Sequence, residues 1–108
     1  MLYDNMRVLR SQVFAEFGGL CIGVDCRESA AELHHLIPRG VIRYKLESLN
    51  CVPTCHSCHE SRGRVRGDEV TGKIFPGVKE KSPERWEWYN EHKNEVRSGA
   101  QKLIEEAA

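Results

Sequence analysis

Apolar and polar positions alternate at helical spacing near the start of the chain, and this pattern predicts a helix over 3–17. Successive turns are marked by apolar residues three or four positions apart, with one adjacent pair at 13 and 14: Met6, Leu9, Val13, Phe14 and Phe17. Asp4 or Asn5 can cap the start, and Gly18-Gly19 ends the helix. We interpret the apolar stripe as core packing.

Two short apolar runs follow and predict two strands. The first, over 32–38 (ELHHLIP), is stopped by Pro38, and the second, over 49–54 (LNCVPT), is a strand or turn. A helix is expected from Cys55 to about Arg62, with Gly63 ending it.

The second half of the chain gives one weak and one strong signal. Residues 64–81 contain three glycines and one proline without a clear period, so we expect an irregular segment that wraps around the domain. Ser82-Pro83-Glu84 has the features of a helix start and predicts a helix over 82–98. Trp86 and Tyr89 share a face of it and could stack on bases, although their spacing is more typical of core residues.

With 108 residues, the chain is expected to be a single domain over 1–108 with a small core, because 30% of its residues are charged and 7% aromatic. A bound metal often stabilises so lean a domain. No run of about eighteen apolar residues predicts a membrane span, and the charged N-terminus does not resemble a signal peptide. We therefore expect a cytoplasmic protein whose five cysteines stay reduced.

Two close cysteine pairs indicate a metal site. Cys21-x4-Cys26 and Cys55-x2-Cys58 lie about thirty residues apart and offer the four tetrahedral ligands that structural zinc prefers. Such a closed site has no open position for catalysis. The alternative is four buried free thiols at chance spacing. Cys51 lies in an apolar run and is interpreted as a small core residue.

Four of the five histidines fall within the same region, at positions 34, 35, 56 and 59. A lone histidine is more often structural, but such clustering favours a functional site. His56 lies three residues before His59, so on a helix the two share a face. It could contact phosphate or a metal, or be an exposed residue without a role. His92 stands alone among charges and is interpreted as structural.

The order of these residues resembles the zinc-bearing HNH endonuclease family. The resemblance covers residues 18–63 and rests on the two cysteine pairs, on the run Glu32-Leu-His34-His35-Leu-Ile-Pro38-Arg39, and on Leu49-Asn50 followed by Cys55-His-Ser-Cys58-His59. It implies an α+β fold with a ββα-metal, treble-clef-like core around the zinc, flanked by the two terminal helices. The spacing with Arg43-Tyr44 also resembles phage recombination nucleases of the NinG type, which would place the protein in a bacterial host.

The resemblance also implies roles for the histidines. His35 would be the general base, and His34 and His59 would hold a catalytic divalent ion, Mg²⁺ or the softer Mn²⁺ or Ni²⁺. Asn50 would pin the loop between the strands and help to orient His35. Adjacent residues on a regular strand point to opposite faces. Unless the strand ends or bends between His34 and His35, one of them is structural, and the two roles could be exchanged.

Charge is distributed unevenly, although the formal net charge is zero. Between residues 34 and 67 there are six basic and two acidic residues, a local excess of four positive charges. Such a segment suits contact with nucleic-acid phosphates, although charge runs are often only solvated faces. The candidate phosphate contacts are Arg39, Arg62, Arg64 and Arg66.

Taken together, these features predict a metal-dependent endonuclease that hydrolyses phosphodiester bonds of duplex, nicked or branched DNA. The main alternative is a non-catalytic zinc module that binds nucleic acid or protein, and a further one is a structural scaffold. All three accommodate the cysteines, so the histidine site separates them. Substrate form, sequence preference, catalytic metal and oligomeric state stay open.

Overall fold

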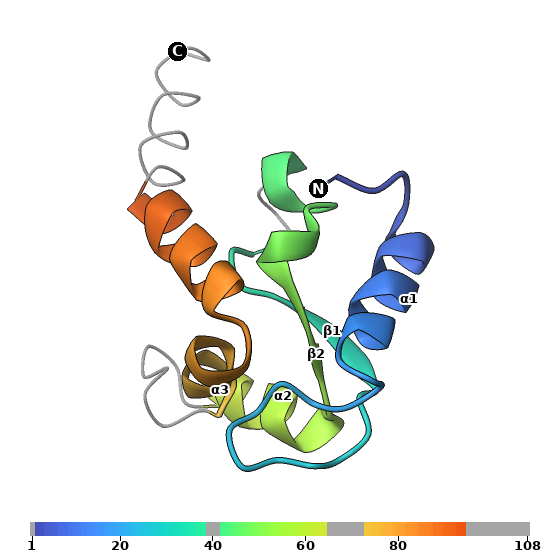
Figure 1. Cartoon of the computed structure of the whole chain (residues 1–108), viewed down its shortest axis with the longest axis vertical. Helices are drawn as coiled ribbons and strands as arrows, with labels where there is room; N and C mark the ends of the chain where they lie inside the picture. Colours follow the sequence, from blue (N-terminus) through green and yellow to red (C-terminus); the bar gives the residue numbers. More distant parts are fainter. Residues whose placement is uncertain (1, 39–41, 65–72, 95–108) are drawn as a thin grey trace.

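The computed structural model describes residues 2–38, 42–64 and 73–94. It has an α+β fold with a two-stranded sheet in the middle and helices around it (Figure 1). Its labelled elements are, in chain order, α1 (Met6–Glu16), β1 (Glu32–His35), η1 (Ile42–Tyr44), η2 (Ser48–Asn50), β2 (Cys51–Thr54), α2 (His56–Arg64) and α3 (Ile74–Lys81). Residues 83–94 are also helical. Within this part of the chain, no helix is both long and apolar enough to cross a membrane.

The first helix forms as its sequence pattern predicts. The side chain of Asn5 caps α1 by accepting a hydrogen bond from the Val8 N–H at 3.0 Å. The chain leaves the helix through Gly18 and Gly19, whose φ angles of 63° and 78° lie in the left-handed region that glycine adopts without strain. The helix, its cap at Asn5 and its end before Gly18 are therefore confirmed, although it begins at Met6 rather than at Tyr3.

The sheet has one face toward α1 and the other toward α2 and α3. β1 and β2 pair antiparallel, with His34 opposite Val52 and His35 opposite Cys51. Because neighbouring residues of a strand point to opposite faces, Leu33 and Cys51 pack against α1, whereas Val52 packs against α3. The register thus separates the two adjacent histidines onto different faces.

Both strands are shorter than predicted. The ladder ends at His35, because the next N–H groups turn toward Asn50 instead: Leu36 donates to its carbonyl oxygen at 2.8 Å and Ile37 to its side-chain Oδ1 at 2.7 Å. The start of the second predicted strand is the 3-10 turn η2, where the Glu47 side chain accepts from the Leu49 N–H at 3.0 Å.

The prediction of an irregular segment over 64–81 is wrong for its last eight residues, which form α3; residues 65–72 lie outside the description. Pro76 stands in the first turn, where its missing N–H leaves no helical bond unmade. Ile74 and Val78 are buried in the core and stabilise the helix. Gly63 does not end α2 either, because that helix continues to Arg64.

The helix after Ser82 begins where predicted, with the Arg85 and Trp86 N–H groups donating to the Ser82 carbonyl at 3.0 and 3.1 Å. Trp86 and Tyr89 pack against the core, which confirms that interpretation. Residues 95–98 of the predicted helix lie outside the description. Arg85 is buried, donates through Nε to the Cys51 carbonyl at 2.8 Å and pairs with Glu16 of α1. This arginine thereby joins the two flanking helices to β2.

Candidate functional site

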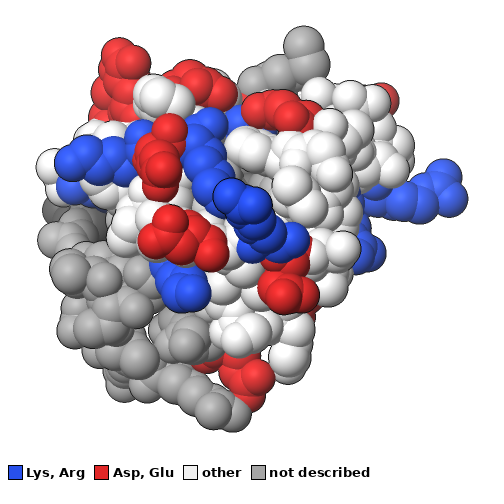
Figure 2. Space-filling model, turned by 60° about the horizontal axis from the view of Figure 1, so that its bottom comes forward, with Lys and Arg blue, Asp and Glu red and all other residues white. Residues whose placement is uncertain are grey.

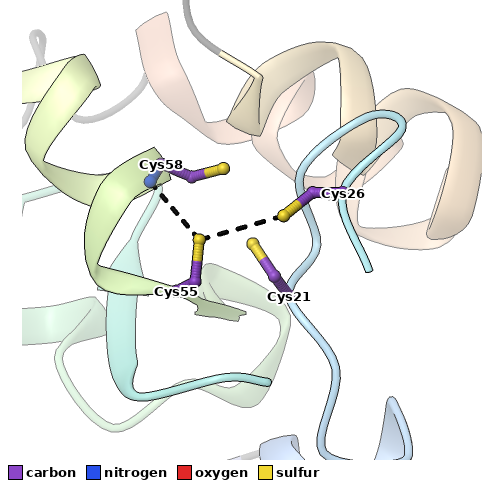
Figure 3. A group of neighbouring side chains, drawn as sticks. All are labelled: Cys21, Cys26, Cys55 and Cys58. Carbon is purple, nitrogen blue, oxygen red and sulfur yellow. Dashed lines mark hydrogen bonds between the residues drawn. The ribbon is translucent and has the colours of Figure 1, made fainter. Parts of the chain in front are cut away.

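The four paired cysteines converge in one cluster. Their sulfur atoms all lie within 4.8 Å of one another and point toward a common centre (Figure 3). Cys21 and Cys26 come from the loop after α1, Cys55 directly precedes α2, and Cys58 lies in its first turn. In residues 2–38, 42–64 and 73–94, this is the only group of three or more potential ligands so close together. The cluster can hold a metal ion such as zinc.

Local backbone geometry prepares these sulfur atoms for a cation. The Gly23 N–H donates to Cys21 Sγ at 3.3 Å, and the Cys58 N–H donates to Cys55 Sγ at 3.4 Å. Although burial acts to raise the pKa of Cys55, the bonds from the Cys58 N–H and the neighbouring thiols outweigh it and lower that pKa. Burial raises the pKa of Cys58. A bound cation would lower the pKa of these thiols again, because it stabilises their thiolate form directly.

α3 holds the first cysteine loop in place, which the sequence did not suggest. The Val24 N–H donates to the Lys73 carbonyl at 3.0 Å. Lys81 Nζ donates to the carbonyls of Cys21, Gly23 and Cys26 at 3.4, 2.7 and 3.4 Å. Its positive charge thus lies on the backbone of the loop that carries two of the cysteines, and four thiolates around one Zn²⁺ would leave two negative charges nearby.

Cys51 is separate from the cluster, as expected. It is fully buried between β1 and α1, and burial raises the pKa of its thiol to about 12. Cys51 therefore stays a neutral thiol and serves as a small core residue.

The structure brings the two predicted ligands of the catalytic ion together. His34 of β1 and His59 of α2 meet edge to face, with ring centroids 5.1 Å apart. His34 is buried, whereas the His59 side chain is 30% exposed, so the pair lies at the boundary between core and solvent. Cys58 directly precedes His59, so the cysteine cluster fixes the turn of α2 that carries this ring.

Glu32 belongs to the same group, although no role was predicted for it from its place in the run Glu32-Leu-His34-His35. It lies two residues before His34 on β1 and therefore on the same face of the sheet. Its Oε2 is 3.4 Å from Nδ1 of His59 and 3.3 Å from Nδ1 of His56. The two-residue strand period from His34 is the signal that could have identified it.

His35 lies on the opposite face and is also buried. Its Nε2 is 2.9 Å from the Lys45 carbonyl oxygen, in the loop that precedes η2. A carbonyl only accepts, so this nitrogen carries the hydrogen and the lone pair of the neutral ring is at Nδ1. β1 does not end or bend between the two histidines, so they do not share a direction.

Asn50 occupies the position expected for a residue that pins the loop. Its side chain is fully buried, and its Oδ1 accepts from the Ile37 N–H at 2.7 Å. Its Nδ2 donates to the carbonyls of Ile37 and Tyr44 at 3.0 and 3.1 Å. One amide thus ties the start and the middle of the connection between the strands to the residue that directly precedes β2.

The remaining histidines differ in exposure. The His56 side chain is 73% exposed and its Nε2 lies 3.1 Å from Glu60 Oε2. His92 stacks on Trp88 with ring centroids 4.4 Å apart and meets Tyr44 edge-on, so it packs against the connection that Asn50 pins.

The four arginines proposed for phosphate contact are only partly placed. Arg62 and Arg64 lie on α2, but their side chains are outside the description, and so are Arg39 and Arg66 altogether. On the face drawn in Figure 2, lysines and arginines alternate with acidic residues and form no continuous basic patch among the described residues.

Comparison of the chain with family models, with curated proteins and with solved structures finds no match. The function is therefore inferred from the geometry of these residues.

Proposed function

We propose that this chain is an HNH-type endonuclease that hydrolyses phosphodiester bonds of DNA with the help of a divalent ion. The observation that carries the proposal is the contact between His34 and His59, whose rings meet although 25 positions separate them in the sequence. A zinc module that only binds a partner has no need for two imidazoles beside its cysteine cluster.

In this proposal the cysteine site is structural and the histidine site is catalytic. Zinc on the four cysteines holds the first turn of α2 against the loop after α1 and so keeps His59 beside His34. His34 and His59 would bind the catalytic ion, and imidazole nitrogens suit Mn²⁺ or Ni²⁺ as well as the abundant Mg²⁺. When bound, that ion would stabilise negative charge on the scissile phosphate and its leaving oxygen.

His35 is proposed to accept the proton of the attacking water. The Lys45 carbonyl holds its ring through Nε2, which makes Nδ1 the basic nitrogen. His35 lies on the face of the sheet opposite His34, so it can serve the same site only around the end of the sheet, where β1 ends at His35. If the attacking water is not reached around that end, His35 is structural and only His34 belongs to the site. Asn50 supports this position by bonding to Ile37 and to Tyr44, the residue before Lys45.

DNA is the proposed partner because of the positive segment around the histidines. Arg62 and Arg64 lie on α2 beyond His59, within the same helix. Together with Arg39 and Arg66 they are proposed to position the duplex without reading its sequence.

A plasmid assay tests this function. Zinc-loaded protein is freed of weakly bound ions with EDTA, its zinc content is checked, and it is incubated with supercoiled plasmid and Mg²⁺, Mn²⁺ or Ni²⁺. We expect nicked or linear product only with an added ion, and none with His59→Ala. Binding of plasmid without cleavage under every ion would overturn the nuclease in favour of a binding module. Neither binding nor cleavage would instead indicate a scaffold.

A further inference from the structure

Glu32 has an environment that the proposed reaction does not yet explain. Its side chain is 37% exposed as a whole, but its Oε2 atom is shielded from solvent between two imidazole rings. Nδ1 of His59 lies 3.4 Å from this oxygen and Nδ1 of His56 lies 3.3 Å from it, but neither donates a hydrogen bond to it, so the oxygen has no hydrogen-bond partner among the described residues. A buried carboxylate oxygen is costly unless N–H groups point at it.

Carboxylate oxygens accept hydrogen bonds and cannot donate them. An oxygen in this place therefore favours the form of the His59 ring that carries its hydrogen on Nδ1. In the neutral ring the lone pair is then on Nε2, which is the nitrogen left to bind a cation. Metal-binding histidines are commonly oriented by a carboxylate in this manner.

We infer that Glu32 is a positioning residue that sets the tautomer and orientation of His59 and thereby the affinity of the catalytic ion. The inference rests on the proposed function, because it assumes that His59 binds that ion. Glu32 would act through His59 and would not itself touch the substrate.

The geometry also identifies a matched control. Glu60 is a carboxylate on the same helix, and its Oε2 lies 3.1 Å from Nε2 of His56. Removing it changes the charge of the cluster as much as removing Glu32 does, but leaves the contact between Glu32 and His59. A difference between the two variants therefore reports the contact and not the charge.

The first measurement is the affinity of zinc-loaded protein for Mn²⁺, followed by calorimetry and by the electron paramagnetic resonance of the free ion. We expect Glu32→Ala to weaken Mn²⁺ binding about 10- to 100-fold, the range for loss of a partner that orients a ligand. Glu32→Gln should recover most of the affinity, since an amide oxygen in this place can also accept a hydrogen from Nδ1 of His59. Glu60→Ala should stay within a few-fold of the wild type.

The second measurement is independent of the ion and of cleavage. Nitrogen-15 shifts of the His59 ring should show hydrogen on Nδ1 in the wild type and in Glu32→Gln, and a mixture of tautomers in Glu32→Ala. Unchanged shifts and unchanged Mn²⁺ affinity in Glu32→Ala would overturn the inference while leaving the nuclease intact. Equal losses in the Gln and Ala variants would overturn it too, because they would make Glu32 a direct ligand. A wild type that binds no Mn²⁺ and cuts no DNA would instead overturn the proposed function.

Discussion

The cysteine cluster and the histidine pair lie next to each other in the sequence but differ in how completely they are built. The cysteines supply four ligand atoms within 4.8 Å, mostly buried and held by backbone N–H groups and by Lys81. The histidine pair has two rings, one of them partly exposed, and a carboxylate behind it. Four cysteines can complete the tetrahedral shell of a zinc ion by themselves, whereas two imidazoles would leave further positions of an ion unfilled.

This difference suggests that the cysteine site stabilises the fold and that the histidine site serves the reaction. A complete ligand set can hold the fold together but offers nothing to a reactant. An incomplete set binds its ion more weakly and can share that ion with a phosphate. If the comparison is correct, damage to the cysteines should remove the fold, and damage to the histidines should remove only activity.

The largest effect is expected for Cys58→Ser. Zinc binding by small domains contributes about 10–16 kcal/mol, which is as large as the whole stability of a typical domain, about 5–15 kcal/mol. Metal analysis should therefore show loss of the single zinc, and circular dichroism should show an unfolded chain. Cys51→Ser is the control, since Cys51 is equally buried but outside the cluster: it should lose stability and keep zinc. A zinc-free wild type with an ordinary melting curve would contradict the structural role.

The next effect distinguishes the two adjacent histidines. His35→Ala should lower the cleavage rate by about 10²- to 10⁴-fold, the usual contribution of a general base, and added metal should not restore it. His34→Ala should shift half-maximal activity to higher ion concentration and be partly rescued by more metal. Both variants should retain zinc, because no histidine belongs to the cysteine cluster.

The reverse pattern, with rescue of His35→Ala alone, would exchange the two roles. A His35→Ala variant that cuts at the wild-type rate but melts earlier would make His35 a structural residue, in keeping with its position on the α1 face. Initial rates measured over a range of Mn²⁺ concentrations decide between these outcomes.

A smaller effect is expected where α3 meets the first cysteine loop. A Cβ atom on Gly77 would lie 2.0 Å from the Ile22 carbonyl oxygen, so Gly77→Ala must push the helix and the loop apart. We expect a loss of about 1–3 kcal/mol in the free energy of unfolding, as for other overpacked sites, together with faster release of zinc to a chelator. Lys79→Ala, on the exposed side of α3, is the control and should change neither quantity. Unchanged stability in Gly77→Ala would show that α3 does not clamp the loop.

The smallest effect is expected for Arg64→Ala on α2. Loss of one phosphate contact should weaken binding to all DNA sequences alike and reduce the salt dependence of the affinity by about one unit of slope. Fluorescence anisotropy at several salt concentrations measures both. Arg7→Ala on α1 provides the control. Equal effects of the two substitutions would assign the affinity to overall charge rather than to α2.

Much of this arrangement could be predicted from short-range patterns. The cap at Asn5, the cysteine spacing and the Ser82-Pro83-Glu84 start all depend on residues within one turn of each other, and the structure confirms them. α3 could not be found in this manner, because Pro76 and Gly77 both disfavour helices locally. Its stability comes from the burial of Ile74 and Val78 and from contact with a loop some fifty residues away.

In the candidate site, too, short-range patterns predicted some residues but not those placed by long-range contacts. The sequence predicted His34 and His59 by their order in a motif, but Glu32 enters only once the register of β1 places it beside α2. Strand geometry predicted that His34 and His35 point to opposite faces unless β1 ends or bends between them. The pairing of His35 with Cys51 shows that β1 continues through both residues. The placement of Arg39 and Arg66 stays a prediction.

The long-range contacts of Lys81 and Arg85 have a consequence for how the protein is made. Lys81 donates to carbonyls in the loop of Cys21, and Arg85 pairs with Glu16, so both contacts join residues about 60 positions apart or more. During synthesis all four cysteines emerge from the ribosome before these two side chains do. Zinc can therefore be captured by a nascent chain whose clamps arrive later, and until they do the metal is open to exchange with competing ions. The order of residues along the chain thus gives the cell a brief interval in which metal selection can be corrected.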